Sequence, residues 1–183
     1  NDQNITSYDA FLRDPAFVRA AQPEIILRFG ALPTSKPVLQ YIQKYAGCPL
    51  IVVGDANTWD EPTQLASEIV RGSPTQVCVE LTATAQVIMD EAPPRTEPDA
   101  WLARWRAANR ASIDALRAGI IEFAEPFEGR VFTELTELLP EQATLFVGNS
   151  MPVRDCDTFF WGAAGVRVMG NRGANGIDGV IST

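Results

Sequence analysis

The sequence predicts an α/β fold built on a Rossmann-like, doubly wound parallel sheet. Two observations predict it: short apolar runs rich in Val, Ile and Leu recur along the 183 residues, and segments with helical spacing separate them. Near-continuous apolar strands that alternate with helices are typical of a parallel sheet covered on both faces. Hydrophobic residues make up 46% of the chain, which at this length is enough for a sizeable core.

Five apolar runs are predicted to be the strands of this fold. Each is short and rich in the residues that favour a buried strand. They are Glu24–Phe29, Pro49–Gly54, Gln76–Leu81, Ala143–Val147 and Gly165–Met169. Right-handed crossovers between parallel strands then give a doubly wound unit.

Capping residues and helical spacing predict the helices. Ser7 and Ser35 stand at N-cap positions, where a hydroxyl accepts a hydrogen bond from an N–H group of the first turn. The predicted helices are Tyr8–Val18 (interrupted at Asp14-Pro15), Lys36–Tyr45, Pro62–Val70, Asp99–Phe123 and Arg130–Leu139. The proline-containing segment Asp90–Pro98 is predicted to be a surface loop.

The end of the chain differs from the rest and predicts a second domain. We expect a boundary near Leu139–Gln142, with a central Rossmann-like domain over residues 1–140 and a truncated segment of another domain over 141–183. Glycines recur at every third position from Gly170 to Gly179. Because the chain begins at Asn1 rather than Met and stops inside this glycine-rich segment, we expect a piece of a longer protein.

Charge and composition exclude several classes of function. The net charge is −8, so the basic footprint of a nucleic-acid-binding protein is missing. No apolar run approaches the roughly 18 residues of a membrane span, and the polar start of the chain does not resemble a signal peptide. The sequence contains no histidine, which excludes Ser-His-Asp catalysis and His-ligated metal sites within these 183 residues. Three scattered cysteines predict free, buried or half-buried thiols and a cytoplasmic protein.

The segment Leu145–Thr158 is the first candidate site. A predicted strand runs into Gly148, the chain turns through Asn149 and Ser150, and a helix begins with Arg154 one turn inside it. Free N–H groups at a helix start attract an anion, and an arginine can bind a carboxylate or phosphate through two hydrogen bonds. The alternative is an ordinary capped helix with a surface arginine.

Two further segments are weaker candidates. Arg172 and Ile177 lie among the glycines of Gly170–Gly179, which suggests a ligand wall or, alternatively, a mobile tail. Lys36 follows the first strand and opens a helix, where doubly wound folds bind ligands; the alternative is a surface lysine. Other prominent side chains are interpreted as structural: Trp59, Trp101 and Trp105 as packing residues, and Glu80 as a strand-end carboxylate.

Two long motifs carry a resemblance to a known family. The segments GNSMPVRDCDTFF (148–160) and NRGANGIDGVIST (171–183) closely resemble the 2-succinyl-5-enolpyruvyl-6-hydroxy-3-cyclohexene-1-carboxylate synthases. YDAFLRDPAF (8–17) and LRFGALPTSKP (27–37) extend the resemblance over nearly the whole chain. It implies a parent enzyme with pyrimidine-binding, central and diphosphate-binding domains, of which this chain holds the central domain and the start of the diphosphate-binding domain.

The resemblance also implies an activity and its site residues. The family uses thiamine diphosphate and Mg²⁺ to decarboxylate 2-oxoglutarate and add the succinyl unit to isochorismate, in menaquinone and phylloquinone biosynthesis. Matching positions place Asn149 and Ser150 beside the cofactor diphosphate and Ile177 near its thiazolium ring. They place Lys36, Arg154 and Arg172 on the substrate carboxylates. The parent is expected to be a homo-oligomer with its active sites between subunits.

The same resemblance places essential parts outside this sequence. The glutamate that activates the cofactor belongs to the pyrimidine-binding domain, and the metal-binding Gly-Asp…Asn segment lies beyond Thr183. No catalytic or metal-binding residue is therefore expected in the fragment, which we expect to be inactive and to bind the cofactor weakly or not at all. The competing interpretation is a free-standing Rossmann-like module that binds a nucleotide or an acidic metabolite, although the G-x-G-x-x-G fingerprint of such modules is missing after the first strand.

Overall fold

The structure is a computed structural model that describes residues 4–55, 61–92, 99–162 and 165–171. Parallel strands and helices alternate along the chain, so the α/β prediction is confirmed, and the sheets are those of a Rossmann-like fragment. The helices are α1 (Tyr8–Phe11), α2 (Pro15–Ala20), α3 (Lys36–Lys44), α4 (Pro74–Glu91), α5 (Ala100–Glu122), α6 (Glu128–Leu138) and α7 (Met151–Phe159). The strands are β1 (Ile26–Phe29), β2 (Leu50–Gly54), β3 (Glu68–Arg71), β4 (Thr144–Val147) and β5 (Arg167–Gly170).

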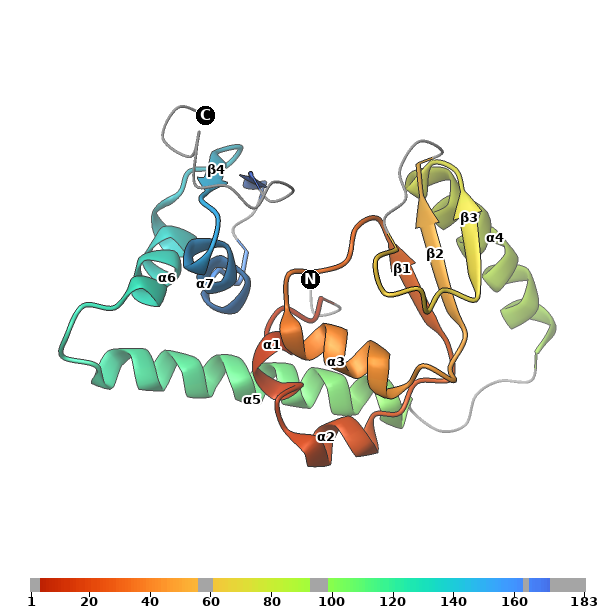
Figure 1. Cartoon of the computed structure of the whole chain (residues 1–183), viewed down its shortest axis with the longest axis horizontal. Helices are drawn as coiled ribbons and strands as arrows, with labels where there is room; N and C mark the ends of the chain where they lie inside the picture. The colour runs from red at the N-terminus through yellow and green to blue at the C-terminus, as the bar shows by residue number, and fades with distance from the viewer. Residues whose placement is uncertain (1–3, 56–60, 93–98, 163–164, 172–183) are drawn as a thin grey trace.

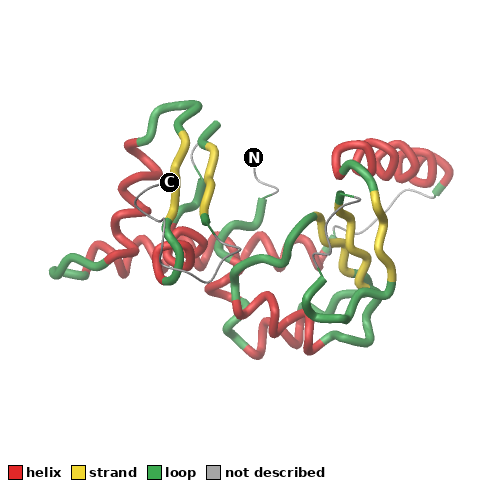
Figure 2. Tube along the Cα trace, turned by 45° about the horizontal axis from the view of Figure 1, so that its top comes forward, coloured by secondary structure: helices red, strands yellow, loops and turns green. Residues whose placement is uncertain are grey.

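The described strands form two separate parallel sheets (Figure 2). One has the order β1-β2-β3, with Ile26 opposite Leu50 and Ile51 opposite Glu68. The other pairs β4 with β5. Figure 1 shows the first sheet on the right, and β4 with α6 and α7 on the left, while the long helix α5 runs below both groups. Helix α1 contacts α3, α5 and α7, so it lies where the two groups meet.

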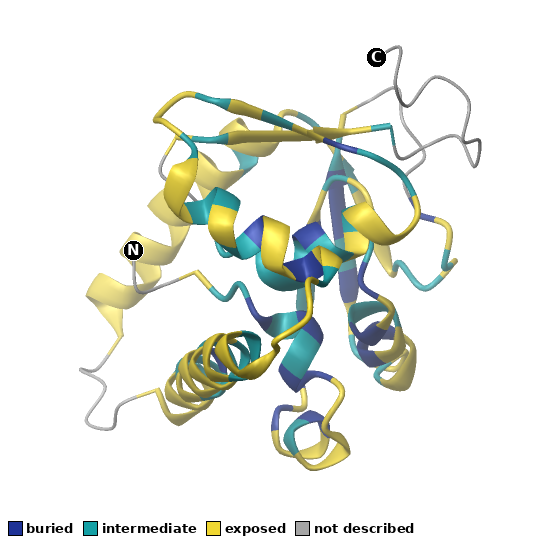
Figure 3. Cartoon of the chain, turned by 90° about the vertical axis from the view of Figure 1, so that its left-hand side faces the viewer, coloured by how far each residue is buried: buried dark blue, intermediate teal, exposed yellow. Residues whose placement is uncertain are grey.

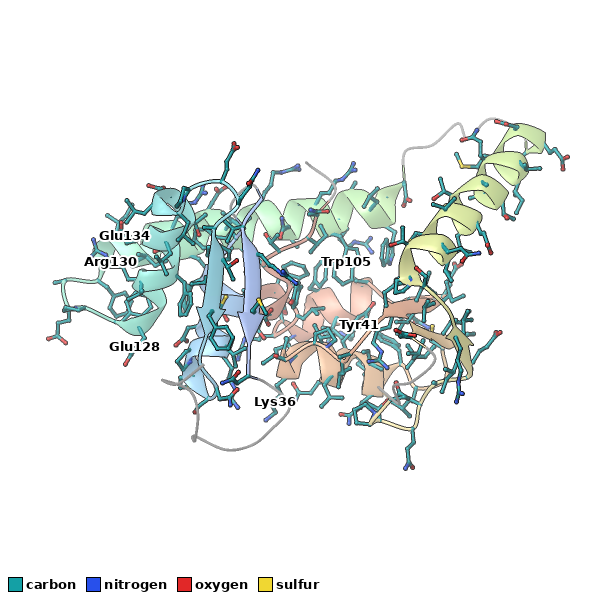
Figure 4. All side chains as sticks on the ribbon, turned by 90° about the horizontal axis from the view of Figure 1, so that it is seen from above. Lys36, Tyr41, Trp105, Glu128, Arg130 and Glu134 are labelled. Atoms are coloured by element: carbon teal, nitrogen blue, oxygen red, sulfur yellow. The ribbon has the colours of Figure 1, made fainter. Side chains whose placement is uncertain are left out.

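An aromatic cluster packs α1, α2, α3 and α5 together. The Trp105 ring of α5 lies 5.5 Å from that of Phe11, 5.3 Å from that of Phe17 and 6.0 Å from that of Tyr41, all edge to face. Figure 4 shows Tyr41 and Trp105 turned toward each other. The prediction that Trp105 is a packing residue is confirmed, whereas its neighbour Trp101 stays 45% exposed. Trp59 lies outside the described residues.

Two further cores hold the sheets. Leu50 and Val52 of β2 are buried against Ile42 of α3. On the other side of the molecule, Phe132 of α6 packs with Val147 of β4 and Cys156 of α7. Because α6 packs on α7 across the expected boundary near Leu139–Gln142, the residues around that boundary share a core; the boundary itself stays a prediction.

Two predicted elements are wrong, and both lie between Pro62 and Leu81. The predicted strand Gln76–Leu81 is part of helix α4. Its β-branched residues imitate a strand, but Pro74 stands in the first turn and no proline or glycine interrupts the helix before its end at Glu91. Glu80 is accordingly an exposed helix residue that accepts a hydrogen bond from Gln76, not a strand-end carboxylate.

The predicted helix Pro62–Val70 is the second error. The strand of this region is β3, which pairs with β2, and a loop precedes it. Gln64 adopts a positive φ of 57° in that loop, which interrupts any helix. Two smaller corrections follow: α4 extends through Asp90 and Glu91 into the predicted loop, and Ser7 makes no side-chain capping bond, whereas Asp14 caps α2.

The sheets are less covered than the sequence predicts. Leu27 and Phe29 of β1 remain 42% and 38% exposed, every residue of β5 is exposed, and no residue of α4 is buried (Figure 3). The three cysteines are free, as expected, but Cys78 is exposed on α4 rather than buried. Among the described residues, no helix is long and apolar enough to cross a membrane.

Candidate anion-binding site

The turn between β4 and α7 presents the residues of the first candidate site. Val147 is buried and anchors the end of β4. The chain then turns at Ser150, whose φ of 72° lies in the left-handed region that few non-glycine residues adopt. Helix α7 begins immediately afterwards with Pro152 in its first turn, where the lack of a proline N–H costs no helix hydrogen bond.

The start of α7 has the chemistry of an anion-binding site. The exposed Ser150 side chain makes no capping hydrogen bond to α7, so the N–H groups of the first turn have no side-chain cap from it. Arg154 lies one turn inside the helix and is exposed, with its guanidinium 4.0 Å from the sulfur of Met151. Asn149 is half-buried beside Ser150. N–H groups, a hydroxyl and an arginine thus occupy one end of one helix.

Two half-buried acidic residues of α7 have charged forms that are disfavoured. Burial raises the pKa of Asp157, as does the nearby Asp9, while a hydrogen bond from Tyr8 acts in the opposite direction. Burial and the neighbouring Glu128 raise the pKa of Asp155 against the effect of Arg154. Burial also raises the pKa of Cys156 to about 11, which keeps its thiol protonated and unreactive at neutral pH.

Lys36 opens helix α3, as predicted. Ser35 caps this helix, because its Oγ accepts a hydrogen bond from the N–H of Val38 at 3.3 Å. The Lys36 side chain is exposed and, in Figure 4, lies at the edge of the molecule away from Trp105. Together with Arg13 and Lys44 it lines a cavity of about 370 Å³ between α3 and the α1–α2 region.

The predicted site residues are only partly brought together. Ser150 and Arg154 share the start of α7 with Asn149, whereas Lys36 lies on another helix, and no hydrogen bond joins it to α7 within the described part of the chain. Both helices contact α1. Arg172 and Ile177 lie outside the described residues, so their placement stays a prediction. Among the described residues, no three Cys, Asp or Glu side chains gather in a group that could hold a metal ion.

Sequence reasoning missed a buried ion pair in the first sheet. Arg28 Nη2 of β1 lies 2.6 Å from Glu61 Oε2, and these side chains are only 7% and 3% exposed. Burial acts to raise the pKa of Glu61, but hydrogen bonds from Thr63 and Leu65 and the charge of Arg28 lower it below its ordinary value. An arginine inside an otherwise apolar strand was the signal that a buried partner is needed, although it does not identify Glu61 as that partner.

Comparison with known proteins gives the same family as the motifs. The 2-succinyl-5-enolpyruvyl-6-hydroxy-3-cyclohexene-1-carboxylate synthase of Geobacillus thermodenitrificans is 46% identical over 180 residues, which are 98% of this chain and 29% of the relative. The synthase of the same name from Chloroflexus aurantiacus is 42% identical over 187 residues, 100% of this chain and 30% of the relative. The chain is a piece of a protein of this synthase family.

This result confirms the resemblance drawn from the motifs and also limits it. The chain spans about 30% of the length of the curated synthases it matches. No family model matches the chain. The chain is therefore assigned to a protein of this synthase family. The activity of the whole protein is proposed from that assignment.

Proposed function

We propose that this chain is part of a thiamine-diphosphate-dependent synthase that decarboxylates 2-oxoglutarate and adds the succinyl unit to isochorismate, a step of menaquinone or phylloquinone biosynthesis. The observation that carries the proposal is the match of 98% of the chain, at 46% identity, to a synthase of that name. The parent protein is expected to be a cytoplasmic homo-oligomer. The chain's own share of the site is the start of α7, Lys36 and the segment with Arg172 and Ile177.

The start of α7 fits the diphosphate of such a cofactor. A diphosphate needs N–H and hydroxyl donors, and the Ser150 side chain does not cap the first turn of α7. Thiamine diphosphate with Mg²⁺, when bound, supplies the carbanion chemistry of decarboxylation and carbon–carbon bond formation. Asn149 and Ser150 would hold the diphosphate, and Ile177 would pack against the thiazolium ring.

The cations would bind the substrates. Both 2-oxoglutarate and isochorismate are dicarboxylates, and a guanidinium can hold a carboxylate through two parallel hydrogen bonds. Arg154 is exposed one turn from Ser150, so it can reach an anion beside the diphosphate. Lys36 and Arg172 would neutralise further carboxylates, Lys36 from the first-sheet side of the molecule. Electrostatic attraction from these groups orients the substrates for the reaction.

A segment exchange tests the proposal. The 180 matching residues of the Geobacillus thermodenitrificans synthase are replaced by this chain, and carbon dioxide release from 2-oxoglutarate is measured with isochorismate present. We expect activity, and we expect Arg154→Lys to reduce kcat/KM by about tenfold or more, because lysine keeps the charge but not the two-bonded geometry. A folded but inactive exchange protein would contradict the proposal and favour the alternative of a nucleotide- or metabolite-binding module.

The isolated chain provides a second test. Because the activating glutamate and the metal-binding segment are expected outside these residues, calorimetric titration with thiamine diphosphate and Mg²⁺ should give weak binding or none. Tight binding would contradict the expected division of the site between this chain and the rest of the parent.

A further inference from the structure

Helix α1 connects the two groups of elements through polar side chains. It is only four residues long, yet it contacts α3, α5 and α7. Two consecutive residues of α1 make these links: Tyr8 bonds to Asp157 of α7, and Asp9 bonds to Ser35, the N-cap of α3. The link between these helices therefore passes through two consecutive residues.

Tyr8 makes the contact to α7. Its hydroxyl donates a hydrogen bond to Asp157 Oδ1 at 2.5 Å, which joins positions 149 residues apart in the sequence. Both side chains are half-buried. Burial and the neighbouring carboxylates raise the pKa of Tyr8, so the hydroxyl keeps the proton that it donates. Asp157 lies three residues after Arg154, hence one turn further along α7 and on the same side of the helix.

Asp9 makes the contact to α3. It is 5% exposed, and its Oδ1 accepts a hydrogen bond from Ser35 Oγ at 2.6 Å. Ser35 caps α3 directly before Lys36. The other oxygen of Asp9 pairs with Arg13 at 2.7 Å, and this arginine also donates to the Asp9 carbonyl. Asp9 therefore holds the start of α3, and its own position is fixed by Arg13, just after the end of α1.

The backbone before α1 is fixed as well. The N–H groups of Thr6 and Ser7 both donate to Asn109 Oδ1 of α5, at 2.9 and 2.8 Å. Asn109 is buried. Tyr8 thus reaches Asp157 from a segment that is tied to α5 and to α3, so its hydroxyl is a fixed point rather than a movable surface group.

We propose that Tyr8 is a positioning residue whose hydrogen bond to Asp157 fixes α7, and with it Ser150 and Arg154, relative to Lys36. The expected effect of this contact on ligand binding rests on the function proposed above. The contact itself does not, because it is made between residues of this chain alone. Without the Tyr8 hydroxyl, α7 keeps its apolar contacts with Phe132 and Val147 but loses its polar link to α1.

Hydrogen exchange on the full 183-residue chain tests the contact. Tyr8→Phe removes the hydroxyl and keeps the ring. Since a hydrogen bond to a charged group contributes more than a neutral one, we expect exchange in peptides covering α7 to accelerate about tenfold. The matched control is Tyr45→Phe, which removes a hydroxyl that donates to the Val18 carbonyl of α2 at 2.6 Å and not to α7. This control should leave α7 exchange unchanged. Equal α7 exchange in the two variants would overturn the proposal.

A double substitution separates a direct contact from general loosening. If Tyr8 acts through Asp157, then Asp157→Ala should accelerate α7 exchange as well, and adding Tyr8→Phe to Asp157→Ala should have almost no additional effect. Fully multiplicative effects of the two substitutions would mean that they act independently, which would also overturn the proposal.

Enzyme kinetics of the segment-exchanged synthase test whether the Tyr8–Asp157 contact affects the proposed substrate site. There, Tyr8→Phe should raise the KM for 2-oxoglutarate at least threefold and change kcat less than twofold, because a displaced Arg154 binds a carboxylate less well. Tyr45→Phe should change neither constant. If the unsubstituted segment-exchanged synthase is inactive, the proposed function fails. The hydrogen-exchange measurements on the isolated chain then still decide the role of Tyr8. If that protein is active and Tyr8→Phe leaves KM unchanged, the positioning role is refuted.

Discussion

Buried and half-buried carboxyl groups near the two sheets have pKa values that are shifted in opposite directions. Around the β1–β2–β3 sheet, Glu61 is buried but ionised easily, because Arg28, Thr63 and Leu65 supply partners for its carboxylate. Around the β4–β5 sheet, Asp155 and Asp157 are half-buried residues of α7, and burial raises the pKa of each. The difference lies in the partners. Arg28 and the hydrogen bonds from Thr63 and Leu65 outweigh burial for Glu61. Arg154 and the Tyr8 hydroxyl do not outweigh burial and the neighbouring carboxylates for Asp155 and Asp157.

This contrast fits the roles that the two regions have in the proposed function. A buried ion pair costs desolvation energy and fixes one geometry, which suits a scaffold. The half-buried carboxylates of α7 disfavour negative charge at their own positions, whereas the N–H groups at the exposed start of the helix stabilise an anion, which suits a binding element. In the proposed function, the second region would present Ser150 and Arg154, while Ser35 and Asp9 hold the start of α3, where Lys36 lies.

Breaking the ion pair of the first sheet should have the largest effect. Glu61→Gln removes the charge that faces Arg28, and loss of one member of a buried pair costs about 3 kcal/mol in free energy of unfolding. Urea denaturation measures this loss. The control is Glu134→Gln, which breaks an exposed pair with Arg130 (N–O distance 3.4 Å; Figure 4) and should cost less than about 1 kcal/mol. Equal losses of free energy in both variants would show that the buried pair of Glu61 and Arg28 contributes no more to stability than the exposed pair.

Overpacking α6 against α7 should have a smaller but still large effect on the second region. A Cβ atom added at Gly129 would overlap the rings of Phe159 and Phe127, so Gly129→Ala should cost about 1–3 kcal/mol. Urea denaturation measures the loss of free energy of unfolding, and hydrogen exchange in peptides covering α7 shows where the structure is destabilised.

Gly119→Ala is the matched control for this substitution. Gly119 lies in the last turn of α5 with no heavy atom within 4 Å of the added Cβ, so the substitution should stabilise the helix by at most about 0.5–1 kcal/mol. A destabilised Gly119→Ala, or an unaffected Gly129→Ala, would contradict the packing described for α6 and α7.

The sequence predicted the contrast between the two regions only in part. Strands β1, β2, β4 and β5 could be predicted because apolar runs and breakers mark them. The stretch from Pro62 to Leu81 could not, since β3 is stabilised by pairing with β2, and its residues 68–71 carry only a weak strand pattern of their own. The β-branched start of α4 imitated the missing strand.

The candidate site was predicted to a similar degree. The turn at Ser150 and the position of Arg154 follow from local signals, a glycine and a proline around a polar pair. The partners Glu61, for Arg28, and Asp157, for Tyr8, are separated from them by 33 and 149 residues. No local pattern encodes such pairs, because the fold alone brings them together.

The opposite pKa shifts predict opposite responses of the two regions to acid, which is the smallest effect and the most specific one. The pKa of Glu61 is lowered from its ordinary value of 4.5, so its contribution to stability is present above pH 4.5 and is lost as the pH falls through the lowered pKa. The pKa values of Asp155 and Asp157 are raised from 3.8, so the region around α7 is most stable below that pH and loses stability as the pH rises through the raised values. Local hydrogen exchange, corrected for the intrinsic pH dependence of the reaction, should therefore slow in α7 as the pH falls through the raised pKa values of Asp155 and Asp157. In β2 it should accelerate only as the pH falls below 4.5, through the lowered pKa of Glu61. Asp157→Asn should reduce the response of α7 without altering that of β2, whereas a parallel response of both regions would show that their carboxylates are not in the contrasting environments described here.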